Sequence, residues 1–101
     1  MDERRFEFDW DEAKERANVR KHRLSFDLAR TIFNDPRLLT VADLEHSEME
    51  VRWFSIGCAF NGTILAVVYR WSEVDPTTTK IRIISARKAT QNEIRQYEES
   101  L

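Results

Sequence analysis

The sequence of 101 residues contains very little cysteine and glycine. Its single cysteine, Cys58, excludes a disulfide within the chain and disfavours a metal site built on thiolates. The two glycines cannot supply a glycine-rich phosphate loop or the Gly-x-Ser-x-Gly turn that presents a nucleophilic serine. The sequence therefore gives poor support to the enzyme classes that depend on those motifs.

Long apolar runs are also absent. No stretch approaches the roughly 20 apolar residues that cross a bilayer, and residues 1–5 lack the hydrophobic segment of a signal peptide. The length fits one domain, residues 1–101, without a linker or an internal repeat. We therefore expect a single-domain cytoplasmic protein with no membrane contact.

The charge is distributed unevenly along the chain. The formal net charge is −2, yet residues 51–88 contain six Lys or Arg and only two Asp or Glu. Residues 1–50 have the opposite balance, with nine basic and thirteen acidic side chains. Because salt screens charges over about 8–10 Å, local density matters more for phosphate binding than the overall sum. The 51–88 segment is therefore the better candidate for binding a polyanion.

The N-terminal half predicts a strand followed by two helices. Residues 6–8 alternate as in a strand, and Asp9 is expected to cap a helix that runs to about His22, with a face of Trp10, Ala13 and Ala17 against a sheet. Ser25 is expected to cap a shorter helix that has an apolar stripe. Asp35-Pro36 is expected to end that helix. Residues 38–41 predict a strand, and a polar loop follows at 43–50.

The next segment predicts a β-hairpin. Asn61-Gly62 joins two β-rich runs and favours a two-residue type I′ turn. That turn would place Tyr69 opposite Phe54 and would form two Arg–Trp pairs across the strands, Arg52 with Trp71 and Trp53 with Arg70. Residues 64–68 are apolar on both faces, which suggests that a second protomer or a segment of a partner protein covers one of them.

The C-terminal part predicts a polar loop at 72–79, a third strand at 80–87 and a last helix. Thr90 and Glu93 form a capping box for that helix, whose apolar side carries Ile94, Tyr97 and Leu101. The whole order predicts an α+β fold, a small antiparallel sheet with two N-terminal helices and one C-terminal helix on one side.

Four stretches resemble the BrnT toxins of type II toxin–antitoxin systems, and together they cover nearly the whole chain. They are 8–11 leading into 18–22, 25–27 leading into 33–36, 46–48 with 52–53 and 56–57, and 82–90 with Glu93 and Tyr97. The resemblance implies a RelE-like fold and a ribonuclease that inhibits translation. From the residues themselves we expect neither a metal nor another cofactor. The resemblance also implies a BrnA-like antitoxin that neutralises the toxin and connects the complex to operator DNA, and we expect a homodimer within that complex.

The chemistry of RNA cleavage selects the candidate site residues. A base takes the 2′-hydroxyl proton, cations stabilise the phosphorane, and an acid protonates the leaving oxygen. The catalytic candidates are His22, Arg52, Tyr69, Arg82 and Arg87, and the substrate-binding candidates are Lys21, Arg70, Lys88 and Tyr97. His22 is the leading proton-transfer candidate, whereas His46 is a weaker one. Arg82 and Arg87 are five residues apart on one strand, so we expect them on opposite faces.

A structural role is the alternative for each of these residues. His22 would then interact with the helix dipole, the arginines would form ion pairs, and both tyrosines would pack in the core. The family usually has Thr-x-Arg after the hairpin tyrosine, but here Arg70-Trp71-Ser72 follows Tyr69. Arg23 also stands where the family commonly has glycine. A catalytically eroded, non-enzymatic partner of a DNA-binding antitoxin is therefore the alternative function.

Overall fold

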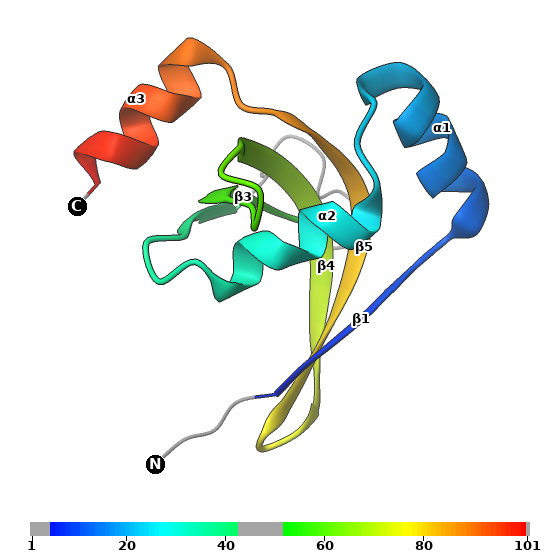
Figure 1. Cartoon of the computed structure of the whole chain (residues 1–101). Coiled ribbons are helices and arrows are strands. Elements are labelled where there is room, and N and C mark those ends of the chain that lie inside the picture. Colours follow the sequence, from blue (N-terminus) through cyan, green and yellow to red (C-terminus); the bar gives the residue numbers. More distant parts are fainter. Residues whose placement is uncertain (1–4, 43–51, 101) are drawn as a thin grey trace.

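A computed structural model describes residues 5–42 and 52–100 and shows an α+β fold. Its strands are β1 (Arg5–Trp10), β2 (Leu39–Ala42), β3 (Trp53–Cys58), β4 (Ile64–Asp75) and β5 (Thr78–Lys88). Its helices are α1 (Glu12–His22), α2 (Phe26–Ala29), the 3-10 helix η1 (Arg30–Asn34) and α3 (Gln91–Glu99). Figure 1 shows the helices gathered around one end of the sheet, with β1 and the β4–β5 hairpin extending beyond them.

The sheet is mixed, with the order β1-β5-β4-β3-β2. Strand β1 pairs parallel to β5, and the other neighbours are antiparallel. The prediction of an antiparallel sheet is therefore wrong at β1. That strand has no hairpin partner next to it in the sequence, so no tight turn fixes its direction.

Helix α1 begins two residues later than predicted. Asp11, not Asp9, is the N-cap, and its Oδ1 accepts a hydrogen bond from the backbone N–H of Lys14 at 3.1 Å. Asp9 stays in β1, where it pairs with Arg82. The predicted alanine face is also wrong, because the residue of α1 that is buried is Asn18. The predicted end at His22 is confirmed.

The main core lies between one sheet face and the α2–η1 segment. Ser25 caps α2 as predicted, since its hydroxyl accepts from the N–H of Leu28 at 3.0 Å. Phe26, Ala29 and Ile32 form a buried stripe against the sheet. Full burial of each of the two large side chains is worth about 1.5–3 kcal/mol, so this short segment contributes much of the core.

The β3–β4 hairpin has a different turn from the predicted one. Gly62 alone has a positive φ in the turn, 87°, and the Ala59 N–H donates to Thr63 O at 2.8 Å. The loop therefore holds three residues, a type I turn followed by a left-handed glycine. Tyr69 consequently lies opposite Trp53 instead of Phe54. This shift by one residue abolishes both predicted Arg–Trp pairs and brings the Trp53 and Trp71 rings to 6.2 Å.

Strand β5 contains a bulge that changes which side chains share a face. Val68 pairs with Ser85, but the next residue, Tyr69, pairs with Ile83, so Ile84 is an extra residue. Arg82 lies opposite Arg70, and Arg87 lies opposite Ala66, four residues earlier on β4. Arg82 and Arg87 are therefore on the same face, and the prediction of opposite faces is wrong.

The second sheet face is partly covered by α3. The predicted capping box of Thr90 and Glu93 is confirmed. Ile56 and Ala66 pair across β3 and β4 and are buried although they lie outside the main core, and α3 contacts β3. The helices thus do not all lie on one side. The chain itself buries part of the face that we expected a second protein to cover.

The β4–β5 hairpin replaces the predicted loop at 72–79. Strand β4 continues to Asp75, whose carboxylate accepts from the N–H and the hydroxyl of Thr77 at 2.9 Å each. The predicted loop at 43–50, with His46, lies outside the described residues, and so does Leu101, which was predicted on the apolar side of the last helix. Within the described ranges, no helix is long and apolar enough to cross a membrane.

Candidate functional site

Three arginines from three consecutive strand regions converge on one cavity of about 160 Å³. The lining consists of Asp11, Lys14, Arg52, Arg70, Arg82, Ile83 and Ile84. The hollow is mainly polar and lies where the N-terminal end of α1 meets the sheet. Its position and composition make it the strongest candidate for binding an anionic substrate.

The sheet register explains why these arginines meet. Arg70 and Arg82 are direct partners on β4 and β5. Arg52 precedes Trp53, which pairs with Tyr69, and alternation along each chain puts Arg52 on the same side as Arg70. The hairpin register and the alternation on β4 thus bring three separate sequence positions together.

Carboxylates hold part of this positive charge in place. Asp9 Oδ2 lies 3.2 Å from Arg82 Nη1 and 3.2 Å from Lys80 Nζ. The ion pair engages one terminal nitrogen of Arg82, which leaves the rest of its planar fork for a phosphate. Asp11 is fully exposed, and the hydrogen bond from the Lys14 N–H lowers the pKa of its carboxyl group below 3.8. Lys14 adds a fourth cation to the lining.

Arg87 has a different environment. Its two terminal nitrogens bind the two carboxylate oxygens of Glu93 at 2.7 and 2.9 Å, and its guanidinium lies 5.9 Å from the centre of the Phe54 ring. The hydrogen bonds from Arg87 lower the pKa of Glu93 below its usual 4.5, although burial opposes the shift. Because Glu93 occupies its fork, Arg87 is placed to anchor α3.

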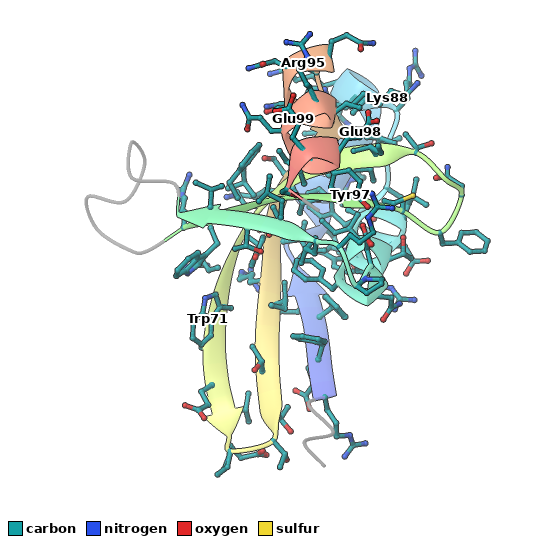
Figure 2. The ribbon with its side chains drawn as sticks, turned by 90° about the vertical axis from the view of Figure 1, so that its left-hand side faces the viewer. Trp71, Lys88, Arg95, Tyr97, Glu98 and Glu99 are labelled. Carbon is teal, nitrogen blue, oxygen red and sulfur yellow. The ribbon has the colours of Figure 1, made fainter. Side chains whose placement is uncertain are left out.

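Both predicted tyrosines are buried. The Tyr69 hydroxyl lies 2.7 Å from the Ser55 hydroxyl, and Phe33 packs edge-on against the Tyr69 ring at 4.9 Å. Burial raises the pKa of Tyr69. The Tyr97 hydroxyl donates to Asp35 Oδ2 at 2.5 Å, and its side chain points from α3 into the body of the molecule (Figure 2). Neither tyrosine lines the cationic cavity.

The remaining predicted residues lie away from the cavity. His22, half-buried, is the last residue of α1, eight residues beyond Lys14, which corresponds to about 12 Å along the helix. Lys21 is exposed beside it, and Lys88 is exposed at the end of β5. The structure therefore brings together Arg52, Arg70 and Arg82 but leaves His22, Lys21 and Lys88 outside.

Sequence reasoning missed three members of the site, Lys14, Asp11 and Asp9. From the sequence, Asp9 is expected only to cap a helix, and neither Asp11 nor Lys14 is expected in the site. The missing signal was the true N-cap, which fixes the side of α1 that turns toward β5. Placing the cap at Asp11 would have brought Lys14 to the sheet.

A second hollow lies on the face that carries η1. It is an apolar groove of about 230 Å³ lined by Phe6, Phe33, Leu38, Tyr69, Trp71, Thr79 and Ile81. Trp71 is 45% exposed there, on the part of β4 that extends beyond the helices (Figure 2). In residues 5–42 and 52–100, no three His, Cys, Asp or Glu side chains gather where they could hold a metal ion.

Comparison with known proteins identifies a family match that spans most of the chain. The model of the family described as "Ribonuclease toxin, BrnT, of type II toxin-antitoxin system" matches residues 10–93. The crystal structure of the Brucella abortus ribonuclease toxin BrnT is similar, with 22% sequence identity and a TM-score of 0.60 over 86% of this chain and 99% of that one. At this identity the structural match shows the fold alone. No curated protein matches the sequence.

Proposed function

The chain belongs to the BrnT family of ribonuclease toxins of type II toxin–antitoxin systems, and on that premise we propose that its arginine cavity is the site of RNA cleavage. The observation that carries the proposal is the convergence of Arg52, Arg70 and Arg82 on one hollow. A guanidinium fork matches the oxygens of a phosphate, and several forks in one cavity match the extra charge of a pentacoordinate phosphorane.

The reaction assigned to this site is a transesterification within the RNA. The 2′-oxygen bonds to phosphorus, the bond from phosphorus to the 5′-oxygen breaks, and the products are a 2′,3′-cyclic phosphate and a 5′-hydroxyl. Arg82 and Arg70 bind the non-bridging oxygens from one side and Arg52 from the neighbouring strand region. Removing one such preorganised donor elsewhere costs about 10²–10³ in rate, which sets the scale expected here.

We assign the proton-transfer roles to residues at the N-terminal end of α1. Lys14, an ammonium in the cavity lining, donates the proton that the 5′-oxygen takes as it leaves. Asp11 is the carboxylate positioned to accept the 2′-hydroxyl proton, but its lowered pKa makes it a weak base. We therefore assign most of the catalysis to the arginines. His22, about 12 Å along α1, has no proton-transfer role in this proposal.

The cleavage is proposed to proceed without a metal ion. Four cationic side chains line the cavity with the Asp11 carboxylate, and Asp9 is already bonded to Arg82 and Lys80. Such a surface repels a divalent cation while it supplies the positive charge that the metal would bring.

The partner proposed for the toxin is a BrnA-like antitoxin, because a type II system pairs the toxin with a protein that neutralises it. Phe6, Trp71 and Val74 are exposed apolar side chains around the groove and the long hairpin, a composition suited to a protein partner. We propose that the complex reaches operator DNA only through the antitoxin and holds two toxin copies. In this proposal the toxin acts in the cytoplasm, where it cleaves RNA and so inhibits translation. A RelE-like fold is also part of the proposal.

The alternative function, an eroded toxin that serves only as a partner of the antitoxin, is favoured by the replacement of Thr-x-Arg after Tyr69. The position of Arg70 in the cavity argues that its cation still serves the same site.

Growth after induced expression separates the two functions. The chain alone, Arg82→Ala and the exposed-surface control Arg95→Ala are expressed at matched levels. The proposal predicts growth arrest by the wild type and the control and relief in Arg82→Ala. Normal growth with well-expressed, folded wild-type protein would favour the non-enzymatic partner.

A further inference from the structure

Helix α1 and the residue that follows it carry an unusual density of positive charge. Five cations lie on α1 and the residue that follows it: Lys14, Arg16, Arg20, Lys21 and Arg23. All five are exposed. Between Lys14 and Arg23 there is one acid, Glu15, and its carboxylate accepts the Phe26 N–H at 2.9 Å. Since the whole chain has a net charge of −2, this density is a local feature.

Ion pairs among the described residues do not account for most of these charges. In the described part of the chain, Arg16, Arg20, Lys21 and Arg23 form no ion pair with another residue. The helix dipole favours cations in the last turn, which covers Arg20 and Lys21 but not Arg16.

Arg23 is held in a backbone conformation that its residue type disfavours. Its φ is 61° and its ψ is 30°, the left-handed region that glycine occupies after a helix. Its backbone N–H still closes the helix by bonding to Val19 O at 2.9 Å. Glycine would make the same bond without the steric conflict of a Cβ, so the arginine side chain adds charge at the expense of a favourable helix end.

Three of these cations share one face of α1, which starts close to the arginine cavity. At about 100° per residue, Arg16, Arg20 and Arg23 lie within about 60° of one another around the helix and turn away from Lys14, which faces the cavity. Lys14 lines the cavity, and Arg23 lies nine residues later, about 14 Å along the helix axis. That length corresponds to about four stacked nucleotides of a single strand. In α1, Val19 is the exposed large apolar side chain, which is too little apolar surface for the core of a protein interface.

We infer that α1 is a binding track for the RNA that flanks the cleaved bond, with Arg16, Arg20 and Arg23 contacting backbone phosphates. This inference rests on the proposed cleavage in the arginine cavity and adds a site outside it. Phosphate contacts of this kind raise affinity without sequence preference and depend strongly on salt.

The test compares two RNA substrates that share one cleavage site, a dinucleotide and a twelve-nucleotide single strand. The triple variant Arg16→Gln, Arg20→Gln, Arg23→Gln should raise KM for the long RNA at least tenfold, while its kcat and its activity on the dinucleotide stay within twofold of wild type. Loss of three phosphate contacts should also reduce the slope of log affinity against log salt by about 2. The control Arg95→Gln, an exposed arginine on α3, should change neither quantity.

A single variant separates binding from folding. Arg23→Gly should raise Tm by a few degrees because the left-handed position suits glycine, yet it should weaken binding of the long RNA severalfold. Unchanged RNA affinity and an unchanged salt slope in the triple variant would overturn the inference. It would also be overturned if the triple variant bound an antitoxin more weakly than the wild type but bound the long RNA equally well. If the wild type cleaves no RNA, the proposed function fails, but fluorescence anisotropy with the labelled long RNA still tests the track.

Discussion

Arg70 and Arg82 lie directly opposite each other on β4 and β5, in a part of the sheet where Arg52 and Lys14 complete a cationic cavity. Like charges placed directly opposite across strands are normally unfavourable, and Asp9 Oδ2, 3.2 Å from Arg82 Nη1, offsets part of this charge. Arg87, on the same face, is instead bound by Glu93. The two arginines of β5 therefore have different expected roles.

Arg82→Ala and Arg87→Ala should have opposite effects on activity and stability. Arg82→Ala should lower kcat by 10²–10³ with little change in unfolding free energy. Arg87→Ala should leave kcat within a few-fold and destabilise the protein by about 1 kcal/mol, a modest value because solvent screens the partly exposed Arg87–Glu93 pair. Urea unfolding and cleavage rates on the same preparations check both effects, and a large kcat loss in Arg87→Ala would contradict this assignment.

The raised pKa of Tyr97 predicts that the protein loses stability at alkaline pH. Burial and the hydrogen bond to Asp35 raise the pKa of Tyr97 from 10.0 to about 12. Since the unfolded chain releases this proton first, the contribution is complete below pH 10 and is lost as the pH rises toward 12. Tm measured across this range should fall more steeply in the wild type than in Tyr97→Phe. Parallel curves would show that Tyr97 does not titrate in this way.

Substitution of Asn18 should destabilise the protein more than substitution of most other polar residues. Its Nδ2 donates to Leu24 O at 2.9 Å, and its Oδ1 accepts from the Ala86 N–H at 3.0 Å. Asn18→Leu leaves two buried backbone groups without partners and should cost about 2–4 kcal/mol of unfolding free energy. The exposed Asn92→Leu serves as the control and should change stability by less than about 0.5 kcal/mol. Equal denaturation midpoints for the two variants would refute this role.

Replacing either glycine with alanine should destabilise the protein, but for different reasons. A Cβ at Gly57 would lie 2.7 Å from Leu38 Cδ1 and 3.0 Å from Ile32 Cβ, so Gly57→Ala should cost about 1–3 kcal/mol through overpacking. Gly62 has open space around it but a φ of 87°, so Gly62→Ala should cost about 1 kcal/mol through backbone strain. Thermal unfolding of both variants checks the order, and the reverse order would show that the core adapts easily.

Local signals in the sequence predicted much of the fold. The caps at Ser25 and Thr90, the end of α1 at His22 and the positions of most strands are confirmed. Each depends on chemistry within a few residues along the chain. The direction of β1, in contrast, depends on tertiary packing that no local signal reports.

The site was predicted only in part because it depends on single-residue offsets. Asn61-Gly62 fits both a two-residue and a three-residue loop, and the choice decides whether Tyr69 faces Phe54 or Trp53. The bulge at Ile84 leaves no clear pattern in the sequence but puts Arg82 and Arg87 on one face. Arg52, Arg70 and Arg82 were predicted as site residues from the sequence. That they line the same cavity follows only from the strand register.

The most direct test of the central claim is cleavage of a single-stranded RNA by purified protein in the presence of EDTA, with analysis of the product ends. The account predicts cleavage that EDTA does not abolish, 2′,3′-cyclic phosphate and 5′-hydroxyl ends, and a loss of 10²–10³ in rate for Arg82→Ala but not for Arg95→Ala. Equal rates for Arg82→Ala and the wild type, or no cleavage by a folded wild type, would contradict it.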